Sequence, residues 1–163
     1  MVKSQREGIV PHPVRFDIMA LIYDVVSHTS GLSTSKHIEL KINGPETINV
    51  FADRDHVNVV LRNLVGNAIK FSPFDEIIDV RVTKEDGSVR VSVTDYGSGI
   101  SPEDVVRIMN REKVPGKQGT GGEKGTGLGL LLCQEFVQYN HGTFDIQSIP
   151  GKGTTVSFTL SQD

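Results

Sequence analysis

The residues with the clearest capacity for chemistry lie between Gly119 and Leu130, where six glycines are gathered. A backbone this rich in glycine reaches positive φ and carries few side chains, so its amides can surround an oxyanion. The apolar residues that follow recur at helical spacing, which indicates that the run ends at a helix N-terminus, where anions are favoured. We therefore predict a phosphate-binding loop, with a flexible linker as the alternative interpretation.

Two familiar phosphate loops do not fit this run. A Walker loop ends in Gly-Lys-Ser/Thr, whereas Lys124 is followed by Gly125. A dinucleotide fingerprint has the spacing G-x-G-x-x-G directly after a strand. Here Gly125, Gly127 and Gly129 have the spacing G-x-G-x-G after a long polar stretch.

A second candidate is one face of the helix predicted from Arg54 to about Phe71, for which Asp53 is the expected N-cap. At about 100° per residue, Asn63, Asn67 and Lys70 share a face that has Phe71 at its margin. Two amides, a cation and an aromatic ring without an acid could face a ligand. A solvated face with chance asparagines is the alternative. A separate apolar stripe predicts the buried side of the helix: Val57, Val60, Leu61, Leu64, Val65 and Ala68.

The third candidate is Asp95, which ends a predicted strand and is followed by Gly97, Gly99 and Ile100. Glycines let the backbone approach whatever the aspartate holds, so the segment indicates a binding loop. Asp and Gly are also common in ordinary turns, which is the alternative interpretation.

The remaining pattern predicts the elements that must position these residues. A helix is expected from Phe16 until the Gly31 region, and Ser101 is expected to cap a short helix to about Asn110. A further helix follows the glycine run to about Asn140. Paired strands are expected at 37–42 with 48–51, 77–83 with 88–94, and 143–149 with 154–160. This is an α+β, two-layer sandwich: a mixed, mostly antiparallel sheet with three main helices on one face.

Composition and length bound the class of protein. The chain has 163 residues, 37% of them hydrophobic, and suits one domain at 16–163 after an N-terminal arm or linker remnant at 1–15. A net charge of −3 gives no general attraction to nucleic acid or anionic membrane. Residues 110–124 hold almost nothing apolar, so we expect no core contact there and a mobile loop over an anionic ligand.

Neither a bilayer-spanning apolar run nor a signal peptide is visible, and the chain is expected to be cytoplasmic, although a parent protein could be membrane-anchored. The lone Cys133 excludes an internal disulfide. It lies in an apolar helical run, which favours a small core residue over a reactive thiol.

Taken in order, four segments resemble the N, G1, G2 and G3 boxes of sensor histidine kinases, members of the GHKL group of ATPases with the Bergerat fold. The resemblance covers about residues 16–160. The matching segments are Asn63–Ser72, Asp95–Gly99, Gly125–Leu130 and Gly151–Thr154.

The resemblance implies a catalytic ATP-binding domain with Mg²⁺ held by the side-chain oxygen of Asn67. Lys70 would reach a phosphate and Phe71 would pack on adenine. Asp95 would accept a hydrogen bond from the adenine amine, beside Gly97, Gly99 and Ile100, with Thr154 supporting Asp95 through a water. The G2 segment would contact the phosphates through Gly125, Thr126, Gly127, Leu128, Gly129 and Leu130, assisted by Lys124.

Asn63 bears on the type of reaction. In gyrase-type relatives that hydrolyse ATP, the position four residues before the metal asparagine is a glutamate that activates water. An amide has no usable basicity, and general-base assistance is typically worth about 10²–10⁴-fold. We therefore expect slow hydrolysis and a γ-phosphoryl group that remains available to another acceptor.

Two features depart from the family pattern. None of the five histidines has the context of a phosphoacceptor, so we expect the acceptor on a dimerisation domain elsewhere in a longer kinase, with a response regulator downstream. The phenylalanine usual near the start of the lid is represented by Met109. Phosphoryl transfer to a histidine is the main expectation. A non-catalytic nucleotide-binding module and an anti-sigma-type protein-serine kinase are the alternatives.

Overall fold

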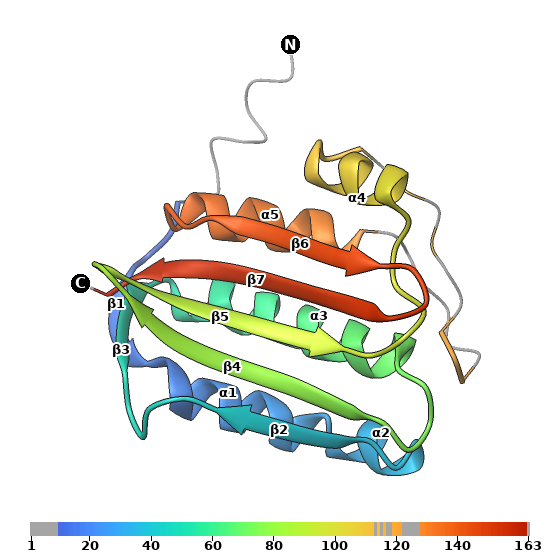
Figure 1. Ribbon diagram of the computed structural model, residues 1–163. Helices are drawn as coiled ribbons and strands as arrows, with labels where there is room; N and C mark the ends of the chain where they lie inside the picture. The colour runs from blue at the N-terminus through green and yellow to red at the C-terminus, as the bar shows by residue number, and fades with distance from the viewer. Residues whose placement is uncertain (1–9, 113, 115, 117–118, 122–127, 163) are drawn as a thin grey trace.

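The computed structural model describes residues 10–112, 114, 116, 119–121 and 128–162. Within them, alternating apolar residues build one seven-stranded sheet. The strands are β1 (Val14–Asp17), β2 (Glu39–Asn43), β3 (Asn49–Ala52), β4 (Ile77–Glu85), β5 (Ser88–Asp95), β6 (Phe144–Ile149) and β7 (Gly153–Ser161). The sheet order is β1-β3-β7-β5-β4-β2, and β6 pairs with β7 (Figure 1).

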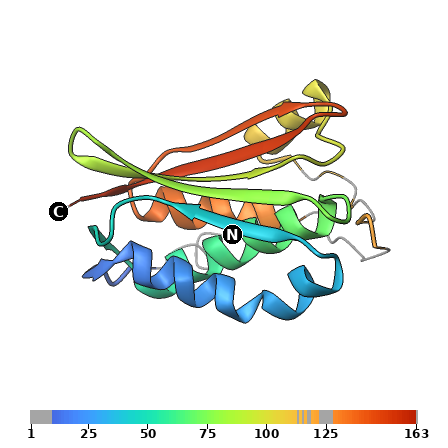
Figure 2. The same ribbon diagram turned by 60° about the horizontal axis from the view of Figure 1, so that its bottom comes forward.

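Helices form a second layer on one face of this sheet (Figure 2). The described helices are α1 (Ile18–His28), α2 (Ser30–Ser35), α3 (Arg54–Phe71), α4 (Pro102–Met109) and α5 (Gly129–Tyr139). The three long helices α1, α3 and α5 cover the sheet, while α4 lies beside the edge strand β6 (Figure 1). Among the described strands, β2 and β4 alone pair in parallel. The predicted α+β two-layer fold, with its mixed and mostly antiparallel sheet, is confirmed.

Helix α3 is the central element of the helical layer and has the two faces that its sequence predicts. Asp53 caps it, because its carboxylate accepts hydrogen bonds from the amides of Asp55 and His56. Every residue of the predicted apolar stripe is buried in the main core. Burial of a valine or leucine side chain stabilises the fold by about 1.5–3 kcal/mol. The separate polar face is therefore held in a fixed orientation by the packing of the stripe.

The N-terminal elements differ from the sequence expectation. Residues 14–17 form β1, paired antiparallel with β3, so the helix begins at Ile18 rather than Phe16. Asp17 accepts hydrogen bonds from the amides of Met19 and Ile48, which fixes the transition from strand to helix. The helix ends at His28 and the chain continues through Gly31 as α2.

The expected pairing of 37–42 with 48–51 is wrong. β2 lies at one sheet edge beside β4, whereas β3 pairs with β1 and with the C-terminal end of β7. The two strands are near in sequence, yet each finds an apolar and hydrogen-bonding partner elsewhere. The other two predicted hairpins are formed, with Gly87 and Gly151 at positive φ in their turns.

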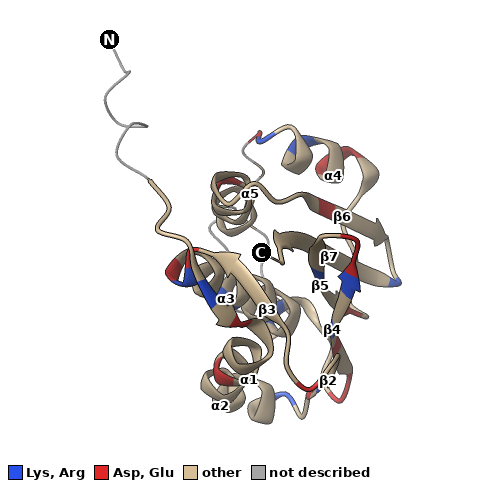
Figure 3. Cartoon of the chain, turned by 90° about the vertical axis from the view of Figure 1, so that its left-hand side faces the viewer, with Lys and Arg blue, Asp and Glu red and all other residues tan. Residues whose placement is uncertain are grey.

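The surface charge agrees with a nearly neutral domain. Basic and acidic positions are both spread over the elements (Figure 3). In the described part of the chain, no helix combines the length and the apolar character needed to cross a bilayer.

Candidate functional site

A cavity of about 360 Å³ lies where α3, the end of β5, α4 and the start of α5 meet. Its volume falls in the range of roughly 300–1,000 Å³ typical of small-molecule sites. Ten of the residues singled out from the sequence line it: Asn63, Asn67, Lys70, Phe71, Asp95, Gly99, Ile100, Gly129, Leu130 and Thr154.

The polar face of α3 forms one wall of this cavity. The Asn63 amide nitrogen donates to the carbonyl of Val59 at 2.9 Å, which fixes the orientation of that side chain. The Lys70 ammonium lies 4.9 Å from the centroid of the Phe71 ring, close enough for a cation–π contact. This wall therefore offers amide oxygens, a cation and an aromatic ring on adjacent turns of one helix.

The N-terminus of α5 faces that wall. A Cβ atom at Gly129 would lie 2.9 Å from Asn63 Oδ1 and 3.8 Å from Asn67 Nδ2, so glycine permits this close approach. The partial positive charge of the helix start is thus directed at the cavity, an arrangement suited to an anion.

Asp95, at the end of β5, supplies an acceptor in the same cavity. Its carboxylate accepts a hydrogen bond from the Gly97 amide at 2.9 Å. Burial raises the pKa of Asp95, while hydrogen bonds from the backbone amides of Gly97 and Thr154 oppose that rise. A partly desolvated carboxylate of this kind gains from a ligand that donates a hydrogen bond to it.

The turn after Asp95 is held against neighbouring backbone. A Cβ atom at Gly97 would lie 2.1 Å from the carbonyl oxygen of Phe71, and one at Gly99 would lie 2.5 Å from that of Ile149. Gly99 also has φ +76°, which favours glycine. The Ile100 amide donates to Ser148 Oγ at 2.7 Å, and Ser148 Oγ lies 2.8 Å from Thr154 Oγ1. These contacts fix the turn to the β6–β7 hairpin.

Two of the predicted site residues that the structure describes do not line the cavity. Gly97 contacts the end of α3 instead, and Leu128 is half exposed just before α5. Lys124, Gly125, Thr126 and Gly127 lie outside the described residues, so their phosphate contacts stay predictions.

The cavity also includes residues that the sequence did not single out. Arg62, Asp104 and Glu112 add charge to its rim, and their positions follow only from how α3 and α4 come together. Val93 and Val156 lie on neighbouring strands, two positions from Asp95 and Thr154. Because side chains alternate along a strand, the sequence could have predicted that these two valines face the same side as Asp95 and Thr154.

The expectation that no residue of 110–124 contacts a core is wrong at Val114. This side chain packs in a small cluster with Ile108 of α4 and Ile146 of β6, and all three are buried. A single valine is enough to anchor this segment, because α4 and the edge strand β6 leave apolar surface between them. Gly119 is buried as well, and the amide of Thr120 donates to the carbonyl of Lys70.

Cys133 has the structural role that its sequence context favours. Its side chain is fully buried in the main core, and burial raises the pKa of the thiol to about 12. At neutral pH the thiolate form is therefore negligible, which argues against a nucleophile. Met109, at the position of the usual phenylalanine, is 38% exposed, with Sδ 3.9 Å from Gln134 Nε2.

The donor set fits a magnesium ion bound together with a nucleotide. The described residues contain no cluster of three His, Cys, Asp or Glu side chains able to hold a metal alone. Mg²⁺ commonly takes one or two protein oxygens and completes its shell with phosphate oxygens and waters. Asn67, on a cavity wall facing a helix N-terminus, can contribute one such oxygen.

Comparison with known proteins identifies the family of the chain. Residues 52–163 match the family of histidine kinase-, DNA gyrase B- and HSP90-like ATPases, and the chain belongs to this family. Within it, the chain is similar to the catalytic domains of sensor histidine kinases, as its four sequence boxes predicted.

Three curated relatives illustrate this similarity. The chain is 37% identical to the sensor histidine kinase WalK of Bacillus subtilis over 150 residues, which is 90% of this chain and 24% of WalK. It is 32% identical to the adaptive-response sensory kinase SasA of Crocosphaera subtropica over 160 residues, 97% of this chain and 41% of SasA. It is 37% identical to the non-motile and phage-resistance protein of Caulobacter vibrioides over 141 residues, 84% of this chain and 17% of that protein. The chain thus spans less than half of each relative.

Solved structures share the fold. The catalytic domain of histidine kinase ThkA superposes with a TM-score of 0.80 at 25% identity, covering 93% of this chain and 98% of that one. Full-length ShkA in complex with AMPPNP gives a TM-score of 0.75 at 26% identity, covering 96% of this chain and 32% of ShkA.

Proposed function

We propose that this domain binds Mg·ATP and donates the γ-phosphoryl group to a histidine on a separate dimerisation domain, as a protein-histidine kinase in two-component signalling. The observation that carries the proposal is that Asn67 and Asp95, far apart in sequence, line the same cavity as the N-terminal residues of α5. One cavity then offers complementary groups for both ends of a nucleotide.

The adenine end would lie against Asp95. Its carboxylate would accept a hydrogen bond from the exocyclic amine, and Gly99 and Ile100 line the same cavity. Phe71, on the adjoining wall, would pack on the ring. Guanine presents a carbonyl in place of the amine, so an ionised Asp95 would disfavour GTP.

The phosphate end would lie between α3 and the start of α5. The α5 amides and Lys70 attract the triphosphate, and Asn67 would hold the metal through its side-chain oxygen. Mg²⁺, when bound, neutralises charge on the phosphate oxygens during transfer. Support for the nucleotide also comes from family membership and from ShkA, which was solved with AMPPNP.

Asn63 favours transfer over hydrolysis. The side chain four residues before Asn67 in α3 is an amide, which is not basic enough to take a proton from water. Its N–H donates to the Val59 carbonyl. In the transfer itself, the bond from the γ-phosphorus to ADP breaks and a bond to the acceptor imidazole nitrogen forms. The protein's part is positioning and charge stabilisation.

The partners follow from the same proposal. The acceptor histidine would come from a dimerisation domain of the same kinase, and a response regulator would receive the phosphoryl group downstream. The relatives WalK and SasA are sensory kinases, and ThkA has been solved in complex with the response regulator TrrA.

The test is transfer of labelled phosphate from ATP to a supplied helical hairpin bearing the acceptor histidine. We expect an acid-labile product and slow release of phosphate without the acceptor. Tight ATP binding without a labelled histidine would instead support a non-catalytic module. An acid-stable product would support a serine kinase, and brisk hydrolysis would reject the kinase assignment.

The metal role has its own test. Replacing Asn67 with Ala should weaken Mg·ATP binding by at least about tenfold, the loss typical even of residues that only support a metal ligand. Binding without Mg²⁺ should change little. Calorimetry with and without the ion measures both, and Asn43→Ala on the exposed edge strand β2 is the matched control. Equal Mg·ATP affinity in Asn67→Ala would remove this residue from the metal site.

A further inference from the structure

A lysine outside the cavity is buried at the C-terminal end of α3. Lys36, the residue that follows α2, is only 6% exposed, although it carries a charge. Its ammonium donates to the carbonyls of Ile69 and Lys70, each at 3.0 Å, and to Thr120 Oγ1 at 2.8 Å. A buried charge is costly unless it is hydrogen-bonded, so these contacts account for its place.

The acceptors belong to the turn that carries two of the cavity residues. The last carbonyls of a helix lack partners within it and carry partial negative charge, which a cation stabilises. One of the two carbonyls is that of Lys70 itself, and Phe71 ends the same turn. Lys36 therefore acts on the backbone from which the Lys70 side chain extends into the cavity.

Thr120 closes the arrangement from a third segment of the chain. Its amide donates to the Lys70 carbonyl at 2.9 Å, and its hydroxyl lies 2.5 Å from the carbonyl of Ser72. Lys36 and Thr120 are 84 residues apart in sequence. The three segments thus meet around one carbonyl.

The backbone of Lys36 is itself anchored. Its carbonyl accepts from the Asp75 amide at 2.9 Å, and two residues later the Ile38 amide donates to Ser33 at 2.8 Å. The Phe74 ring centroid lies 5.8 Å from the Lys36 ammonium. An ammonium on a fixed backbone can set the position of the helix end that it contacts.

We propose that Lys36, with Thr120, is a positioning residue for Lys70: it holds the last turn of α3 so that the Lys70 ammonium meets the nucleotide phosphates. This inference rests on the proposed function for its ligand. Neither Lys36 nor Thr120 lines the cavity, so each would act only through Lys70.

The test is a double-mutant cycle read by Mg·ATP affinity. Lys36→Met should weaken binding about tenfold when Lys70 is present and less than about twofold in the Lys70→Met background, because coupled residues are not additive. Thr120→Val should show the same dependence on Lys70 with a smaller loss. It also serves as the second variant should Lys36→Met fail to fold.

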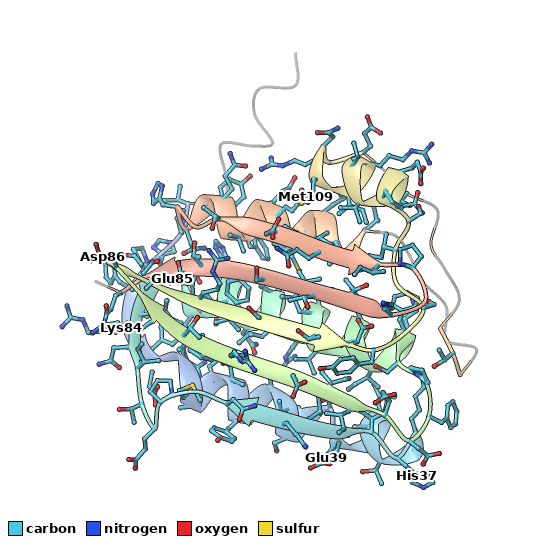
Figure 4. The ribbon with its side chains drawn as sticks, in the orientation of Figure 1. His37, Glu39, Lys84, Glu85, Asp86 and Met109 are labelled. Carbon is cyan, nitrogen blue, oxygen red and sulfur yellow. The ribbon has the colours of Figure 1, made fainter. Side chains whose placement is uncertain are left out.

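Lys84→Met is the matched control, since this exposed lysine lies at the opposite end of the sheet from His37, the neighbour of Lys36 (Figure 4). It should bind Mg·ATP as the unmodified protein does. Equal losses from Lys36→Met with and without Lys70 would show a merely structural role, and unchanged affinity would also overturn the inference.

A second readout needs no nucleotide. Exchange of the Thr120 amide hydrogen, which is bonded to the Lys70 carbonyl, should become about tenfold faster in Lys36→Met and stay unchanged in Lys84→Met. If the unmodified protein failed to bind ATP, the proposed function would fail while this measurement still reported on the contact. Unchanged exchange would show that Lys36 does not hold the turn.

Discussion

Two aspartates show how local surroundings set the charge of a residue. Burial raises the pKa of Asp95, in the cavity wall, above its ordinary value of 3.8. Burial acts on Asp53 in the same direction, but backbone amides of His12, His56 and Asp55, together with the nearby His56 ring, outweigh it and lower the pKa of Asp53. The balance between burial, which raises the pKa, and hydrogen bonds and charge, which lower it, therefore differs between the two carboxyls.

We expect an NMR titration of the side-chain carboxyl carbons to place the pKa of Asp95 above 3.8 and that of Asp53 below it. Bound ATP should lower the pKa of Asp95, because the adenine amine favours the ionised form. By linkage, Mg·ATP affinity should then fall as pH drops through the raised pKa of Asp95. Without nucleotide, the pH dependence of folding stability has the opposite sign. Because the folded-state pKa of Asp95 is raised, ionised Asp95 lowers the free energy of unfolding, and this loss disappears as pH falls through that pKa. A lower pKa for Asp95 than for Asp53 would contradict this account.

The glycine at position 97 makes a prediction from geometry alone. Gly97→Ala would put a Cβ atom 2.1 Å from the Phe71 carbonyl, so the turn after Asp95 and the end of α3 must separate. We expect Mg·ATP affinity to fall at least about tenfold, since displacements near 1 Å can cost about 10²-fold in a positioned site. Gly31→Ala in α2 meets nothing within 4 Å and is the control. Calorimetry compares the two, and equal affinities would show that the contact is unimportant.

At the scale of the element, α3 joins stability and function. Its apolar stripe is buried against the sheet and α5, and the same helix presents Asn63, Asn67 and Lys70 to the cavity. The end of the helix is held by Lys36 and its start by Asp53. An amphipathic helix that is anchored at both ends gives its polar face a defined direction.

Removal of the N-cap of α3 should therefore lower the free energy of unfolding. Asp53→Ala is expected to lower the free energy of unfolding by about 1–2 kcal/mol near neutral pH, as for other caps. Because the folded pKa of Asp53 is depressed, its contribution is present above the unfolded pKa and is lost as pH falls through the folded value. The difference between the proteins should shrink below about pH 4 in urea titrations.

Ser101→Ala provides the comparison, since the neutral Ser101 hydroxyl caps α4 through the Asp104 amide at 3.2 Å. Ser101→Ala should lower the free energy of unfolding by about 1 kcal/mol or less, and this loss should not depend on pH over the same range. A pH-independent cost for Asp53→Ala as well would show that the ionised carboxylate is not what stabilises α3.

At the scale of the whole molecule, the cavity is built from segments spread through the chain. The walls come from α3, β5, α4, α5 and β7, so a ligand seated there stabilises the folded arrangement of all of them. Unfolding separates these elements and removes the site.

Mg·ATP at about 100 times its dissociation constant should raise the free energy of unfolding by about 2.7 kcal/mol. GTP at the same concentration should raise the free energy of unfolding much less. In Asp95→Asn, which places a donor opposite the adenine amine, the ATP effect should be weakened and the preference over GTP lost. Urea denaturation with each nucleotide measures these differences. An unchanged ATP preference in Asp95→Asn would exclude this residue from base recognition.

The amino-acid pattern alone predicted α3 with its cap and two faces, the two tight hairpins, the short capped α4 and each of the four boxes that resemble the family. Each of these depends on residues a few positions apart, where hydrophobic period, capping and turn chemistry act directly. Other features are visible only in the folded chain: β2 pairs with β4, β1 extends the sheet beside β3, and Val114 joins a core cluster. The contact between Lys36 and Thr120 across 84 positions and the desolvation of Asp95 are likewise visible only there. Strand order and the burial of charges depend on contacts between distant segments, which no local pattern encodes.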